Sequence, residues 1–249
     1  MIFKRKVYNK LLEWKSLSAG TSAVLLEGAR RIGKSTIVEE FAKNEYDDYM
    51  ILDFAKENKD VRNNFIENMD NLDTFFRNLF LLKGRSLKGK NCVLIFDEVQ
   101  LFPTARQAIK YLVADGRYEY IETGSLISIK KNVRDILIPS EEYKIKMYPM
   151  DFEEYLWATG DSITFETIQS AFTERKPLGD AIHRRIMKTF RTYMAVGGMP
   201  QAVDAFVSGK TFAQIDFVKR NILRLYEDDL AKYGIDFMVV KKKRFVQLR

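Results

Sequence analysis

The sequence has almost none of the residues that form cross-links or bind transition metals. Among its 249 residues there is one cysteine, Cys92, and one histidine, His183. A single cysteine excludes a disulfide within the chain and a thiolate metal cluster, and a single histidine excludes a histidine metal site. Cys92 lies in the apolar run CVLIF, where we interpret it as a small buried hydrophobe.

Long apolar stretches are also missing. No run approaches the ~18 residues that a membrane helix needs, and the amino-terminal segment MIFKRKVYNKLLEWK is too charged for a signal peptide. The sequence therefore predicts a soluble, cytoplasmic protein with no membrane partner.

The net charge of +7 permits binding of nucleic acid or other anions, but it fits a solvated basic surface equally well. The same two readings apply to the basic run Lys241–Arg244 near the carboxyl terminus.

Apolar runs and amphipathic segments alternate along the first 149 residues. Strands are expected at residues 23–29, 49–55, 91–100, 118–125 and 142–150, with the last of them nearer an edge. Helices are expected at residues 3–16, after the glycine-rich segment at 28–33, at 58–83 and at 104–116. This alternation predicts an α/β fold, in which a parallel sheet is flanked by helices.

From Pro149 onward the pattern becomes helical. Asp151 with Glu154 three residues later is the pattern of a capping box. Two apolar stripes repeat at every fourth position: Ile182, Ile186, Phe190 and Met194, then Val218, Ile222, Tyr226 and Leu230. We expect residues 150–235 to form a smaller, all-helical, lid-like lobe, and residues 236–249 to form a basic tail.

The stretch EGARRIGKST, residues 27–36, has the spacing of a phosphate-binding loop. An apolar strand precedes it and a helical pattern follows, which favours this reading over an ordinary glycine-rich turn. In such a loop the backbone N–H groups and the helix dipole face the phosphates, the lysine reaches the β- and γ-phosphates, and the hydroxyl binds Mg²⁺. The predicted nucleotide-binding residues are Gly28, Ala29, Arg30, Arg31, Ile32, Gly33, Lys34, Ser35 and Thr36.

Arg30 and Arg31 occupy variable positions of this loop. Because the backbone amides face the phosphates, we expect both side chains to point away from them. Two readings stay open: the guanidinium groups pair with carboxylates of the helical lobe or of a neighbouring subunit, or they are simply solvated.

Two acids end the third predicted strand, in VLIFDE. Ligands bind at the carboxyl edge of a parallel sheet, so Asp97 is expected to hold Mg²⁺ together with Ser35. Glu98 is expected to polarise the attacking water, the alternative being a solvated acid at a strand end. In the fourth strand, which ends IETGS, Thr123 is the first candidate and Ser125 the second for a γ-phosphate sensor. Either hydroxyl could instead cap the next turn. The predicted catalytic residues are thus Glu98, Lys34 and Thr123.

Together these segments resemble the AAA+ ATPase class. More narrowly, the chain is similar to archaeal and bacterial predicted ATPases that join an AAA+ module to a helical lid and a nuclease-like carboxyl-terminal domain. The matching pieces are LLEGARRIGKST, VLIFDEVQ, ETGSLISI, YPMDFEEYL and YMAVGGMPQAV. The resemblance covers the chain to about residue 235.

The chain departs from this group in two ways. The stretch PSEEYKIKMYP lacks the Gly-Arg pair that many members carry there, which leaves Arg134 as a weak candidate for an arginine acting on a neighbouring subunit. Members also usually continue well past residue 249, so a carboxyl-terminal domain is expected to be absent here.

The resemblance implies ATP and Mg²⁺ as cofactors and ATP hydrolysis as the activity. It also allows assembly into homo-oligomers, and a nucleic-acid or protein partner reached through the absent domain. Two other functions stay open: a nucleotide-dependent binding module or switch with negligible hydrolysis, and a DNA-binding protein with incidental nucleotide affinity.

Overall fold

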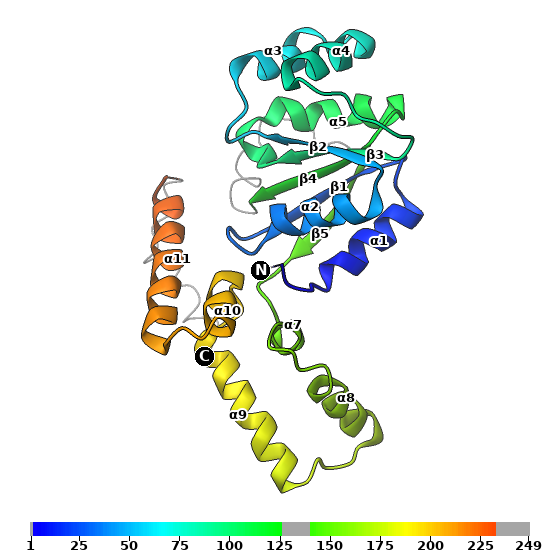
Figure 1. Cartoon of the computed structure of the whole chain (residues 1–249). Helices are drawn as coiled ribbons and strands as arrows, with labels where there is room; N and C mark the ends of the chain where they lie inside the picture. Colours follow the sequence, from blue (N-terminus) through cyan, green and yellow to red (C-terminus); the bar gives the residue numbers. More distant parts are fainter. Residues whose placement is uncertain (1, 126–139, 233–249) are drawn as a thin grey trace. The chain divides into compact units, whose positions relative to one another are not determined.

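The computed structural model describes residues 2–125 and 140–232, and the side chains of Leu230 and Lys232 lie outside the description. The chain divides into two compact units, one of residues 2–148 and one from Pro149 onward. The predicted strands and the glycine-rich loop lie in the first unit, and the second unit is helical (Figure 1).

The first unit is built on five parallel strands, which confirms the predicted fold class. The strands are β1 (Ala23–Gly28), β2 (Asp48–Asp53), β3 (Cys92–Asp97), β4 (Glu119–Ser125) and β5 (Glu142–Met147). Their order is β2-β3-β4-β1-β5, which places β5 at one end of the sheet, as expected. All residues of β1 and β3 are buried, the pattern of central strands that are covered on both faces.

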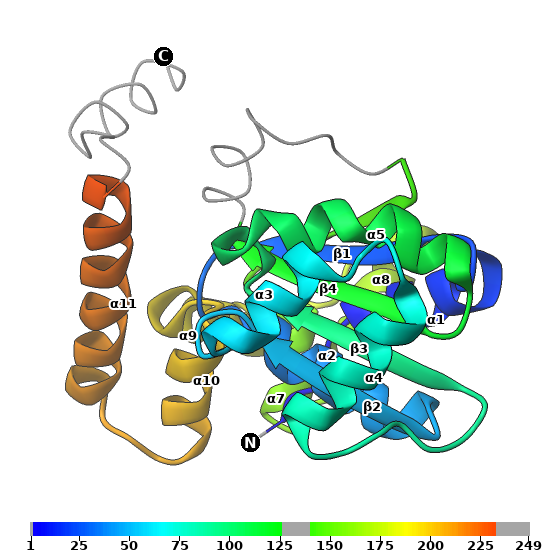
Figure 2. The ribbon, with the colours of Figure 1, turned by 90° about the horizontal axis from the view of Figure 1, so that it is seen from above.

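Helices cover both faces of this sheet. Those of the first unit are α1 (Val7–Leu17), α2 (Lys34–Glu45), α3 (Lys59–Glu67), α4 (Leu72–Lys83) and α5 (Pro103–Asp115), with the 3₁₀ turn η1 (Val99–Leu101). Figures 1 and 2 show α1 and α2 on one face, and α3, α4 and α5 on the other.

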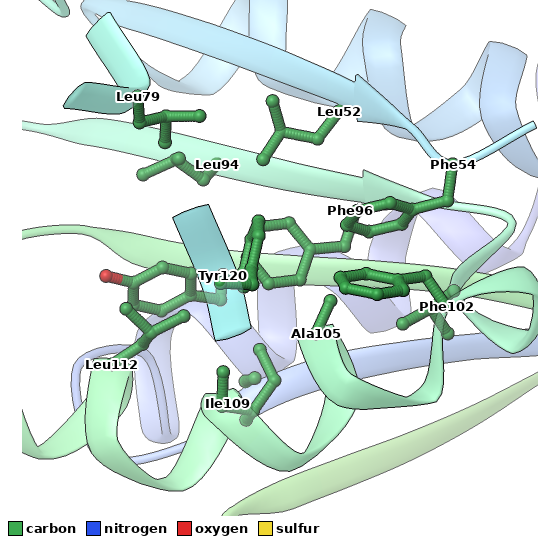
Figure 3. Close-up of a cluster of buried hydrophobic side chains, with 14 of the residues drawn as sticks. Leu52, Phe54, Leu79, Leu94, Phe96, Phe102, Ala105, Ile109, Leu112 and Tyr120 are labelled. Carbon is green, nitrogen blue, oxygen red and sulfur yellow. The ribbon is translucent and has the colours of Figure 1, made fainter. Parts of the chain in front are cut away.

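The main core lies between the sheet and α3, α4 and α5. Apolar side chains of β2, β3 and β4 meet the inner faces of these helices there (Figure 3). Phe54 is surrounded by Phe65, Phe96 and Phe102 at ring-centroid distances of 5.9, 5.8 and 5.3 Å. Tilted and edge-on aromatic pairs of this kind add stabilisation beyond the area that they bury.

One predicted helix is divided in the structure. The segment 58–83 forms α3 and α4 rather than a single helix, because Asn68–Asn71 leave the helical path. The Asn71 side chain accepts a hydrogen bond from Thr74 N at 3.0 Å, which caps α4. An asparagine cap favours the start of a new helix over continuation of the first one. The apolar periodicity continues on both sides of Asn71, so it did not indicate the break.

The second unit contains α7 (Phe152–Ala158), α8 (Thr164–Glu174), α9 (Asp180–Val196), α10 (Pro200–Val207) and α11 (Phe212–Lys232). Asp151 and Glu154 form the predicted capping box. The predicted apolar stripes are only partly buried: Ile186 and Ile222 are buried, whereas Met194 is 59% exposed. Over residues 2–125 and 140–232, no helix combines the length and the apolarity needed to cross a membrane.

Gly198 packs against Met150 and so joins two of the segments that carry the resemblance to predicted ATPases. Met150 N donates to Gly198 O at 2.7 Å, and Tyr193 OH donates to Met150 O at 3.0 Å. A Cβ at Gly198 would lie 2.1 Å from Met150 O, so only glycine fits this approach. The segments YPMDFEEYL and YMAVGGMPQAV thus share a packing role.

A buried ionic cluster joins α5 to β4 and β5. Arg106, 3% exposed, donates to both carboxylate oxygens of Glu142 at 2.5 and 2.7 Å. Glu122 is fully buried nearby. Its burial raises the pKa of Glu122 well above the ordinary value of 4.5, and the negative charge of Glu142 raises it further. Glu122 therefore keeps its proton to a higher pH in the folded chain than in the unfolded chain.

Glu122→Gln is expected to raise the free energy of unfolding relative to wild type, and by more at pH 7.5 than at pH 5. The unfolded state releases the Glu122 proton above about pH 4.5 while the folded state retains it. Wild-type stability therefore falls as pH rises, by up to about 1.4 kcal/mol per pH unit. Urea unfolding at pH 5 and pH 7.5 measures this effect, with Glu67→Gln on the exposed face of α3 as control. If the free energies of unfolding of wild type and Glu122→Gln differ by the same amount at both pH values, the raised pKa of Glu122 is contradicted.

Candidate functional site

The loop between β1 and α2, predicted to bind phosphate, contains two residues with positive φ. Gly33, at the amino-terminal cap of α2, has φ +92°, and Arg31 has φ +61°, so both residues are left-handed. A Cβ at Gly28 would lie 2.4 Å from Met147 O and 2.6 Å from Ile32 Cδ1. Only glycine at position 28 therefore lets the loop lie against β5.

Lys34 is the first residue of α2, and its side chain returns over the loop. It is 5% exposed, and Nζ donates to Gly28 O at 3.1 Å and to Ala29 O at 2.9 Å. Burial lowers the pKa of Lys34, an effect opposed by the negative charges of Glu98 and Asp97. The ammonium group therefore lies within electrostatic range of both predicted acids.

Arg5 holds the loop by hydrogen bonds to backbone carbonyl groups, and this role was not predicted from the sequence. It is 6% exposed, and it donates to Ile32 O at 2.8 Å and to Tyr148 O at 2.7 Å. It thus links the loop to the residue that follows β5. Four basic residues in the first ten, at positions 4, 5, 6 and 10, looked alike in sequence. The burial of Arg5 becomes visible only when the sheet is assembled.

Asp97, the last residue of β3, accepts hydrogen bonds from two hydroxyl groups. Ser35 Oγ donates to Asp97 Oδ1 at 2.8 Å, and Thr123 Oγ1 donates to the same oxygen. Because β4 lies between β1 and β3, Thr123 stands beside both the loop strand and the acid strand. Three predicted site residues therefore meet at the carboxyl edge of the sheet.

Glu98 follows directly in an unusual backbone conformation, with φ +55° and ψ +43°. Its N–H donates to Thr123 Oγ1 at 3.3 Å, and its carboxylate accepts a hydrogen bond from Gln100 Nε2. A left-handed glutamate is uncommon, and the hydrogen bonds on both sides hold it there. Gln100 is the second site residue that sequence reasoning missed, although it belongs to the quoted segment VLIFDEVQ.

The pair Ser35 and Asp97 fits a magnesium ion. A hydroxyl and a carboxylate are hard oxygen ligands, and Mg²⁺ usually takes its other ligands from water and phosphate. Among the residues described, no group of three or more His, Cys, Asp or Glu side chains is placed to hold a metal ion by itself. Such a magnesium site would need phosphate oxygens to complete it.

A hollow of about 590 Å³ opens beside Ser35 and Asp97. Its walls come from α2, β2, β3, the segment after β2 and the end of α4. Asp53, which is paired in register with Asp97, lines it and holds Lys56 at 2.7 Å. Space therefore exists next to the predicted acid for part of a ligand.

The remaining predicted residues lie at the loop surface, at the end of β4 or outside the described residues. Arg30, Arg31 and Thr36 are exposed, and the positive charge of Arg30 acts on Lys34, whose pKa it lowers further. Ser125 is buried at the end of β4. Arg134 and the basic run Lys241–Arg244 lie outside the described residues.

Comparison with known proteins gives matches among solved structures and among family models. A solved structure of AMPPCP-bound DnaA from Aquifex aeolicus is similar with a TM-score of 0.44 and 8% identity. That match covers 82% of this chain and 59% of the DnaA chain, so this chain spans about three-fifths of its length. No match was found among curated proteins.

Two family models match the sequence. Residues 187–248 match a domain of unknown function (DUF8612), which begins within α9. Residues 20–156 match the AAA domain, a segment that covers more than half of the chain and includes the loop, both acids and Thr123. The chain therefore belongs to the AAA domain family.

Proposed function

We propose that the chain binds ATP with Mg²⁺ at the loop of residues 28–36 and hydrolyses it. The observation that carries this proposal is the convergence of Ser35 and Thr123 on the Asp97 carboxylate, next to the buried Lys34. These residues come from three elements: Lys34 and Ser35 from the start of α2, Asp97 from the end of β3, and Thr123 from β4. Their meeting at the carboxyl edge is what phosphoryl-transfer chemistry in this kind of fold requires.

The roles follow from charge and reach. The loop amides and Lys34 hold the phosphates, and Lys34 neutralises charge that develops on the β- and γ-phosphates. Ser35 and Asp97 would hold Mg²⁺, which when bound would supply positive charge that stabilises the charge of the phosphate oxygens. Glu98 orients a water molecule for attack and accepts its proton, and Thr123 contacts the γ-phosphate.

We further propose that residues 150–235 serve as a lid-like lobe, and that the chain acts with further copies or with a protein or nucleic-acid partner. The all-helical second unit supports the first part. Membership of the AAA domain family supports the second. We also propose that residues 236–249 form a basic tail, and this rests on their charge alone.

Lys34→Ala is expected to weaken ATP binding at least tenfold. A hydrogen bond to a charged group contributes about 1.5–3 kcal/mol, and each tenfold change in affinity corresponds to about 1.4 kcal/mol. Calorimetric titration with ATP and Mg²⁺ measures the effect. Lys43→Ala, on the exposed side of the same helix, is the matched control. Equal affinity of wild type and Lys34→Ala would reject the loop assignment.

Glu98→Gln is expected to retain ATP affinity within about threefold and to lose at least 100-fold in kcat, the scale of general base catalysis. The amide keeps the shape of the side chain but cannot accept the proton of water. Steady-state phosphate release and calorimetry give the two values. Joint loss of binding and turnover would make Glu98 structural, and wild type that binds ATP without turnover would favour the nucleotide-switch reading.

Arg30→Ala and Arg31→Ala are each expected to leave ATP affinity within about threefold, or ~0.7 kcal/mol. The backbone of the loop, rather than these two exposed side chains, contacts the phosphates in this proposal. Alanine is preferred to glycine at position 31 because glycine would also relax the left-handed backbone. A loss as large as that of Lys34→Ala would show that an arginine binds phosphate directly.

A further inference from the structure

Gln100 lies between the acid that we assign to water activation and the end of β4. It is 6% exposed and belongs to η1. Its Nε2 donates to Glu98 Oε2, and its Oε1 accepts from Ser125 N at 3.3 Å. One buried amide therefore connects the Glu98 carboxylate to the backbone of β4.

The contacts with Glu98 and Ser125 indicate the orientation of this amide. The backbone N–H of Ser125 can only donate, so it must face the amide oxygen. The amide nitrogen then faces Glu98, whose carboxylate accepts hydrogen bonds when ionised. A flipped amide would set two donors against each other at Ser125 and two acceptors against each other at Glu98.

The backbone turn after β3 makes this contact geometrically available. The left-handed conformation of Glu98 starts η1, in which Leu101 N donates to Glu98 O at 2.9 Å, so the chain folds back at once. The N–H of Glu98 is held by Thr123 Oγ1. Both the backbone and the carboxylate of Glu98 are thus tied to β4, one directly and the other through Gln100.

We propose that Gln100 is a positioning residue that fixes the Glu98 carboxylate for water activation. This inference rests on the proposed ATP hydrolysis. The Gln100 amide occupies Oε2 of Glu98 and leaves Oε1 to receive the proton of the attacking water. Because the other side of the amide is held by Ser125, the end of β4, two residues beyond Thr123, sets the direction of the carboxylate.

Gln100→Leu is expected to lower kcat about tenfold or more, which is the scale of one hydrogen bond to a charged group. The affinity for ATP should stay within about threefold, because Gln100 is not among the residues that hold the phosphates. Gln100→Glu should lower kcat further, since it places a second carboxylate against Glu98. Gln107→Leu, at an exposed position of α5, is the matched control.

A double-mutant cycle separates positioning from a general structural effect. If Gln100 acts through Glu98, then Gln100→Leu should cause no further loss of turnover in a Glu98→Ala background. If Gln100 only supports the fold, the two losses should multiply. Thermal unfolding and ATP calorimetry on each variant show whether the protein is folded and binds nucleotide.

The outcomes are distinguishable from those that test the proposed function. If wild type turns over ATP, three results would overturn the role of Gln100 without affecting the proposed hydrolysis. These are a kcat of Gln100→Leu equal to that of wild type, a higher kcat, and losses in kcat that multiply in the double variant. Wild type without ATP turnover would overturn the proposed hydrolysis, and with it the positioning role. A lower kcat at unchanged ATP affinity, without further loss in the Glu98→Ala background, would establish the role.

Discussion

The Asp97 carboxylate must be satisfied at the buried end of β3, and the site is arranged around that requirement. An ionised carboxylate at 9% exposure needs several donors, and the hydroxyls of Ser35 and Thr123 supply two. Those hydroxyls reach one oxygen in a sheet where β4 lies between β1 and β3 and where α2 begins just after the loop that follows β1. The strand order and the position of the loop are therefore linked through a single acid.

The sequence predicted the parts of this site whose chemistry is local. A glycine-rich turn between an apolar strand and a helical pattern, or an acid at the end of a buried run, can be recognised without knowing the remaining chain. Strand alternation likewise predicted the parallel sheet. Burial of both faces of β1 and β3 follows from the same apolar runs.

Residues whose role depends on distant partners were not predictable in the same way. Arg5 and Gln100 are polar side chains in ordinary surroundings, and each has a partner that is distant in sequence: Ile32 lies 27 residues from Arg5, and Ser125 lies 25 residues from Gln100. The position of Glu122 in a fully buried cluster was hidden because its partners, Arg106 and Glu142, come from another helix and another strand. In the helical unit, periodicity indicated helices but did not show which stripe residues are buried, since Met194 is exposed whereas Ile186 is buried.

The support that Arg5 gives to the loop also determines when the loop can be complete. One of its two acceptors, Tyr148 O, lies 143 residues further along the chain, and the strand before Tyr148 pairs with β1 on the side that β4 leaves open. During synthesis the loop residues emerge early, but β1 remains an unprotected edge until β5 has been made. Contacts of such long sequence separation form slowly, so the loop gains this support late, after nearly the entire first unit has been synthesised.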